Sequence, residues 1–197
     1  RCWNRSGHGN LNVTEAITHS CNYFFYEMGY RFGQSGDPES GTDFNLANER
    51  MREYADLYGL TEKSGIEIEE SAPQFSLVNP SQSAIGQGEH NYTTVGLARY
   101  VATVANSGTC YNLSLLDKVT DRSGNLLKDF SPEVRNTIEM PTSYWDAIHR
   151  GMRGVVEAKK YFVDSGIIAA GKTGTAEESK TRPPHAVFVG YAPFDKP

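Results

Sequence analysis

Apolar residues recur at helical spacing in four segments of the chain. Residues three or four positions apart share one face of a helix, so this spacing predicts amphipathic helices. Thr14 can cap the first of them and Gly33 can end it. The predicted helices run from about 14 to 32, 45 to 58, 93 to 107 and 143 to 155.

The same periodicity predicts which face of each later helix is buried. A capping box at Ser143–Asp146 marks the start of the fourth helix. The expected buried residues are Met51, Tyr54, Ala55 and Tyr58 in the second helix, Val95, Ala98, Val101, Ala102 and Ala105 in the third, and Trp145, Ile148, Met152 and Val155 in the fourth.

Two strand pairs are predicted in the second half. Segments 115–120 and 126–130 flank a glycine-containing turn, and segments 168–176 and 185–192 flank a polar loop. Helices that precede and follow antiparallel strands predict an α+β fold, in which helices cover an antiparallel sheet. The stretch 61–88 has no regular period, and long irregular connections in a compact domain are often functional.

Composition narrows the class of protein. The 197 residues are 38% apolar and 11% aromatic, which is typical of a folded globular body. A net charge of −5 argues against a nucleic-acid surface, and no apolar run approaches the roughly 20 residues that span a bilayer. The three cysteines and five histidines lack metal-ligand spacing, so no metal and no organic cofactor is expected.

Two short motifs carry the candidate chemistry. Lys172-Thr173-Gly174-Thr175 places an ammonium group, two hydroxyls and a glycine on consecutive residues, as in an anion-binding strand edge. Far upstream stands Ser20-Cys21-Asn22, and a K-T-G with an S-x-N triplet is typical of serine enzymes that bind penicillin. A continuous helix would turn Ser20 and Asn22 about 200° apart, so both can face one pocket only if the helix breaks nearby, and a helix end or loop is expected at 20–22.

Other interpretations exist for both motifs. Taken singly, K-T-G-T could be an edge strand, and Ser-Cys-Asn a common helix end. Residues 166–173 also match the phosphate-loop pattern G-x-x-x-x-G-K-[ST]. A phosphate loop needs a strand before it and a helix after it, whereas 167–170 reads as a strand and Pro183-Pro184 follows. Nucleotide binding is therefore the weaker alternative.

The sequence around the motifs resembles class B penicillin-binding proteins, most closely the elongation-type D,D-transpeptidases that cross-link peptidoglycan. The resemblance covers nearly the whole chain and implies a penicillin-binding transpeptidase fold, similar to serine β-lactamases. It rests on Gly7-His8-Gly9, Glu15–Tyr26, Ile85–Gly88, Ala98–Tyr100, Asn106–Thr109, Ala170–Ala176 and Phe188–Pro193.

One departure from the family pattern is important. The family's nucleophile lies in S-x-x-K, and no serine in this chain is followed three positions later by lysine. The resemblance implies that this motif and a membrane anchor lie upstream of Arg1, and that the sheet continues past Pro193. We therefore expect residues 1–197 to be a partial transpeptidase domain, incomplete at both ends and inactive by itself.

The resemblance also implies a reaction and a location. A serine would attack the carbonyl between two terminal D-alanines of a stem peptide, and the amine of a neighbouring stem would resolve the acyl-enzyme. Expected partners are stem peptides, β-lactams and the cell-wall elongation machinery, at the extracytoplasmic face of the bacterial membrane. A non-catalytic penicillin-recognition domain, acting as sensor or scaffold, is the alternative.

By motif position the resemblance assigns a role to each candidate residue. Ser20 would relay a proton, and Lys172 would supply positive potential. The other residues would bind the substrate. Asn22 would hydrogen-bond its backbone amide, the hydroxyls of Thr173 and Thr175 would bind its terminal carboxylate, and Gly174 would let it lie close to the strand. The Thr175 N–H would donate to the oxyanion of the intermediate.

Overall fold

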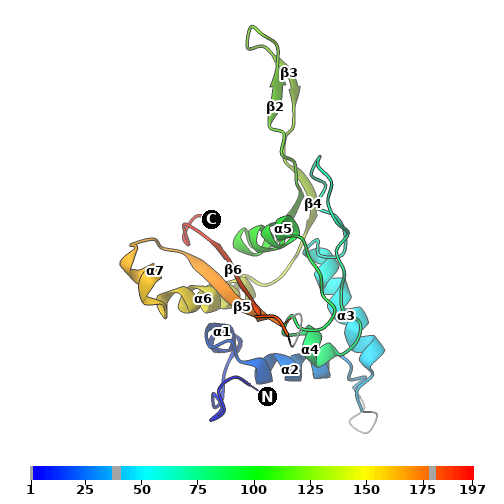
Figure 1. Cartoon of the computed structure of the whole chain (residues 1–197), viewed down its shortest axis with the longest axis vertical. Coiled ribbons are helices and arrows are strands. Elements are labelled where there is room, and N and C mark those ends of the chain that lie inside the picture. The colour runs from blue at the N-terminus through cyan, green and yellow to red at the C-terminus, as the bar shows by residue number, and fades with distance from the viewer. Residues whose placement is uncertain (1, 37–40, 178–180) are drawn as a thin grey trace.

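The computed structural model describes residues 2–36, 41–177 and 181–197, and these form an α+β arrangement (Figure 1). The helices are α1 (Val13–Thr18), α2 (Asn22–Arg31), α3 (Phe44–Leu57), α4 (Pro80–Ser83), α5 (Thr94–Ala105), α6 (Thr142–Glu157) and α7 (Lys160–Asp164). The strands are β1 (Thr109–Asn112), β2 (Lys118–Thr120), β3 (Leu126–Asp129), β4 (Glu133–Thr137), β5 (Ala170–Ala176) and β6 (His185–Tyr191).

Within the described ranges the strands pair antiparallel in twos: β1 with β4, β2 with β3, and β5 with β6. Both predicted hairpins are confirmed, and β2–β3 projects from the rest of the molecule along its long axis (Figure 1). The β1–β4 pair and the short helices α4 and α7 were not predicted, because segments of four or five residues are too short to show a period.

Helix α6 connects the two parts of the chain that carry the motifs. It packs against α1 on one side and β5 on another, around a core of Val104, Met152 and Ala170. The Thr14 hydroxyl donates to the carbonyl of Ala147 at 2.9 Å, and Arg153 donates to the carbonyl of Ala169 at 2.9 Å. Helix α1 and the segment that leads into β5 are therefore fixed to the same helix.

The predicted buried face of α6 is confirmed, since Trp145, Met152 and Val155 are buried. The predicted capping box is wrong: α6 begins at Thr142, and its N-cap is Pro141, which makes no side-chain cap bond. The cap predicted for the first helix is wrong too. Asn12 caps α1 in a capping box with Glu15, while the Thr14 hydroxyl is used in the contact with α6.

Helix α5 matches its predicted buried face only in part, since Ala105 is buried as predicted. Ala98 and Ala102 are exposed, whereas Arg99 and Thr103 are each 1% exposed. The Arg99 guanidinium donates to the carbonyls of four residues that precede α5 in the chain: Gly59, Glu62, Lys63 and Ser64. These bonds use both terminal nitrogens of the guanidinium, while its Nε has no partner among the described residues. A charged side chain can be buried when most of its donors are satisfied in this way, and hydrophobic periodicity cannot detect that.

Helix α3 matches its prediction in part. Ala55 is buried, but Tyr54 is 53% exposed. None of the helices in the described ranges has the length and apolarity needed to cross a bilayer.

Candidate functional site

The predicted break between the first two helices is confirmed, and Ser20 stands in it. Helix α1 ends at Thr18 and α2 starts at Asn22. The Cys21 N–H donates to the Ala16 carbonyl at 3.0 Å and the Ser20 N–H to the Ile17 carbonyl at 3.2 Å, as in a Schellman motif. Ser20 has a φ of 51°, in the left-handed region that usually selects glycine at this position.

Lys172 meets Ser20 across the fold. The Lys172 ammonium donates to the Ser20 hydroxyl oxygen and to the Thr173 carbonyl, both at 2.8 Å. Lys172 lies in β5, which α6 holds beside α1. The two motif residues are thus brought into direct contact although 152 positions separate them.

Burial changes the electrostatics of this contact. The pKa of the Lys172 ammonium is below its usual value, chiefly because the half-buried group is desolvated and further because the positive charge of Lys159 opposes it. A lysine with a lowered pKa gives up its proton more readily, which suits a group in a proton relay.

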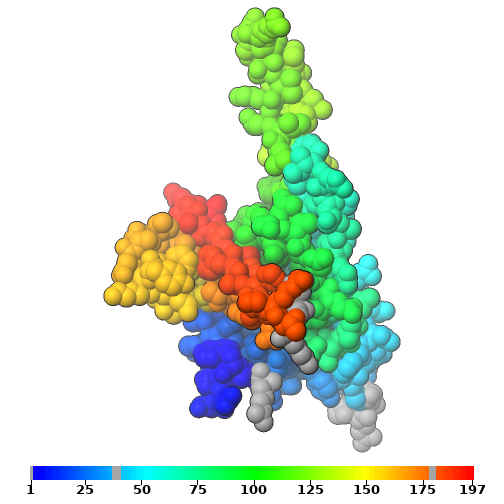
Figure 2. Space-filling view, in the orientation of Figure 1, coloured from blue at the N-terminus to red at the C-terminus, as the bar shows by residue number. Residues whose placement is uncertain are grey.

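The rest of the lysine motif lies open at the surface. Thr173, Gly174 and Thr175 are exposed, and the β5–β6 pair runs over the face of the molecule seen in Figure 2. The Gln87 side chain donates to the Thr175 carbonyl at 3.2 Å. In an antiparallel strand the N–H and C=O of one residue point to the same edge, so the Thr175 N–H also points away from β6.

Gln87 was not among the predicted site residues, although it belongs to the irregular stretch 61–88, and connections of that kind are often functional. The signal was the pair Gly86 and Gly88, both of which have positive φ and let the loop turn closely. Asn22, the third residue of the serine motif, is half-buried and is the first residue of α2.

A cluster of possible metal ligands includes Cys21, the middle residue of the serine motif. The side chains of Cys2, His8 and Cys21 place Sγ or ring nitrogen atoms within 4.8 Å of one another. Desolvation raises the pKa of the Cys2 thiol, but hydrogen bonds from the backbones of Asn4, Tyr23 and Asn22 outweigh it and leave the pKa lowered.

Residues of these types can hold a thiophilic metal ion such as zinc, which prefers thiolate and imidazole ligands. The expectation of no metal site rested on spacing along the sequence. Spacing could not find this cluster, because the loop before α1 folds back over the α1–α2 connection.

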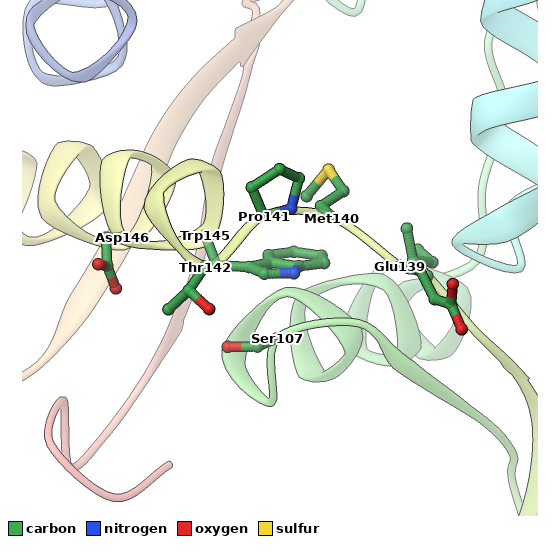
Figure 3. Close-up of a pocket in the computed structure, with 8 residues that line it drawn as sticks. Ser107, Glu139, Met140, Pro141, Thr142, Trp145 and Asp146 are labelled. Atoms are coloured by element: carbon green, nitrogen blue, oxygen red, sulfur yellow. The ribbon is translucent and has the colours of Figure 1, made fainter.

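A pocket elsewhere shares no residue with the two motifs. It lies where the connection after β4 enters α6, and the Trp145 indole lies between Pro141 and Ser107 there (Figure 3). The remaining lining residues are Ile138, Glu139, Met140, Thr142 and Asp146. This pocket does not contribute to the arrangement around Lys172.

The phosphate-loop alternative does not fit the structure. Lys172 and Thr173 lie inside β5, which starts at Ala170 and pairs with β6 along its full length. Amides in a strand alternate in direction and cannot converge on a phosphate as those of a loop before a helix do.

Comparisons with known proteins agree with the motif geometry. All residues, 1–197, match the family model described as the penicillin binding protein transpeptidase domain. The chain is 27% identical over 233 residues to the peptidoglycan D,D-transpeptidase MrdA of Haemophilus influenzae, with 100% of this chain and 33% of that protein aligned.

Penicillin-binding protein 2B of Streptococcus pneumoniae is similar in both sequence and structure. It is 26% identical over 221 residues, which cover 99% of this chain and 32% of that protein. Its solved structure from strain R6 superposes with a TM-score of 0.76 and covers 95% of this chain and 34% of its own. The predicted α+β fold is confirmed, and the chain spans about a third of the length of these relatives.

Proposed function

This chain belongs to the penicillin-binding protein transpeptidase family, and on that premise we propose that its parent protein cross-links peptidoglycan through an acyl-serine intermediate. The observation that carries the proposal is the 2.8 Å hydrogen bond from Lys172 to Ser20. It supports the pairing of the two motifs, because neither a plain edge strand nor a helix end requires a half-buried lysine that donates to a serine with a left-handed backbone.

In the proposed reaction a serine hydroxyl attacks the carbonyl between two terminal D-alanines. The C–N bond breaks, D-alanine leaves with a proton on its amine, and the acyl group stays on the serine as an ester. The amine of a neighbouring stem then displaces the serine, which regains a proton. β-Lactams would acylate the same serine.

Ser20 and Lys172 form the proton relay in this scheme. The Ser20 hydroxyl passes a proton between nucleophile and leaving nitrogen, and Lys172 stabilises the deprotonated forms along that route. Asn22 binds the substrate's backbone amide.

The open edge of β5 forms the substrate wall. The hydroxyls of Thr173 and Thr175 bind the terminal carboxylate, and Gly174 lets the peptide lie close to the strand. The outward-pointing Thr175 N–H supplies one donor of the oxyanion hole. Loss of one such donor typically costs about 100- to 1,000-fold in rate.

Our proposal places the nucleophile outside these 197 residues, because none of their serines is followed three positions later by lysine. The parent would act at the extracytoplasmic face of the bacterial membrane, on stem peptides and in contact with the wall-elongation machinery. A non-catalytic sensor or scaffold with the same two motifs is the second candidate, and the absence of S-x-x-K from the chain is what keeps it open.

Labelling with a fluorescent penicillin tests both candidates. We expect no covalent adduct with this chain alone, and an adduct with a longer polypeptide extended upstream to S-x-x-K. Replacement of that upstream serine by alanine is the control and should abolish the adduct. An adduct on the isolated chain would overturn the assignment of roles, and an unlabelled longer polypeptide would favour the non-catalytic domain.

A further inference from the structure

Ser20 is held in a backbone conformation that serine does not prefer. Its φ of 51° is left-handed, and a non-glycine residue there persists only where its surroundings hold it. Glycine would fit this helix end without strain, but glycine has no hydroxyl to meet Lys172. The position therefore needs a serine for chemistry and an outside support for its conformation.

Trp3 makes contacts that supply such a support. Its indole N–H donates to the Ser20 carbonyl at 3.0 Å and to the His19 carbonyl at 3.2 Å. Both carbonyls lie at the end of α1, where they have no partner within the helix. One donor thus clamps the two peptide units on either side of the strained φ.

A stack of rings holds the indole in place. Trp3 contacts the His8 ring edge-on with centroids 5.2 Å apart, and His8 stacks on His19 at 5.8 Å. Trp3 is nevertheless 65% exposed. An exposed tryptophan whose polar atom is used on two backbone carbonyls contributes little to the core, so its contacts point to a local role.

We propose that Trp3 is a positioning residue that holds Ser20 in the conformation in which its hydroxyl meets Lys172. This inference rests on the proposed function, because its consequence is measured in serine acylation. Without the clamp the α1–α2 connection would relax toward an unstrained φ, and the Ser20 hydroxyl would leave the ammonium group for part of the time.

The test uses Trp3→Phe in the full parent protein, because phenylalanine keeps an aromatic ring beside His8 while it removes the N–H donor together with part of the indole. We expect the rate constant of acylation by a fluorescent penicillin to fall about fivefold, the factor that one net hydrogen bond of ordinary strength represents. The dissociation constant of the pre-covalent complex should stay unchanged. Tyr144→Phe is the matched control, since Tyr144 is a 61% exposed aromatic on α6 away from both motifs, and its rate constant should equal the wild type.

A double-mutant cycle separates positioning from general stabilisation. If Trp3 acts through the Ser20 hydroxyl, Trp3→Phe should have no further effect on acylation in a Ser20→Ala background. An equal loss in both backgrounds would overturn the proposal, as would an unchanged rate constant in Trp3→Phe alone.

A measurement on the wild type covers the case in which Trp3→Phe does not fold. The Trp3 indole proton should exchange slowly with solvent despite the exposure of the ring, and fast exchange would contradict the clamp. If the wild-type parent itself is not acylated, the proposed function fails. If it is acylated and Trp3→Phe is unaffected, only the positioning role fails.

Discussion

The buried guanidinium of Arg99 gives the sharpest test of how the fold is held together. Arg99 donates to four carbonyls, but these differ in how far they need Arg99 as their hydrogen-bond partner. Glu62 and Lys63 are exposed and can be hydrated, and the Ser64 carbonyl also accepts from the Leu113 N–H at 2.9 Å. The buried Gly59 carbonyl is the one that would lose a partner that water cannot readily replace.

Arg99→Met keeps most of the side-chain volume and removes every donor. An unsatisfied buried carbonyl costs about 1–3 kcal/mol, and the weakened contacts of the 59–64 segment add about 1 kcal/mol. Relief of the desolvated charge offsets part of this, because Glu62 approaches the guanidinium only to 4.0 Å. Without that offset the free energy of unfolding would fall by about 2–4 kcal/mol, and with it we expect a fall of about 1–3 kcal/mol.

The assay is urea unfolding of the parent domain, read as a shift of the midpoint at unchanged slope. Arg31→Met is the matched control. Arg31 has a 65% exposed side chain and an ion pair with Glu27 one helical turn away, so its loss should cost at most about 0.5 kcal/mol. Equal effects of the two substitutions would refute the assignment of Arg99 as the tie between α5 and the 59–64 segment.

Three further substitutions test β5. Because the pKa of Lys172 is lowered in the folded state, its side chain binds more protons in the unfolded chain between that pKa and the usual lysine value, so the contribution of Lys172 to stability should rise with pH through this window. Lys172→Met should lack this rise in pH-dependent urea unfolding and reduce acylation by about 100-fold or more; a retained rise would contradict the burial argument. Gly171→Ala should destabilise the domain by about 2 kcal/mol or more, since a Cβ there would lie 2.3 Å from the Phe188 ring and 2.7 Å from the Val189 carbonyl. Gly174→Ala meets nothing closer than 3.7 Å, so it should change unfolding by less than about 0.5 kcal/mol while reducing acylation, and full activity would remove its substrate role.

Local signals in the sequence were sufficient for the elements that carry the motifs. The rotation of about 200° between Ser20 and Asn22 in a continuous helix predicted a break at 20–22. Helix α1 does end there, and the backbone of Ser20 is in the left-handed region. Strand-forming runs on either side of a polar loop gave the β5–β6 pair. Such features depend on neighbouring residues only, so a single sequence specifies them.

The sequence could not give the face of α5, the support of Trp3 for Ser20, or the gathering of Cys2, His8 and Cys21. Each depends on residues outside the local element. Arg99, for example, is buried because carbonyl groups 35 to 40 residues away accept hydrogen bonds from its guanidinium. Periodicity treats a charged residue as exposed and cannot anticipate such partners.

The sequence by itself determined that a lysine motif and a serine motif exist, in what order, and on which local structures. Only the tertiary structure decided that they meet. Helix α6 packs on α1 and β5 together, and this packing brings the Lys172 ammonium within 2.8 Å of the Ser20 hydroxyl and withdraws it from water. Contact and desolvation arise from packing between distant segments, and no residue pattern within either motif encodes them.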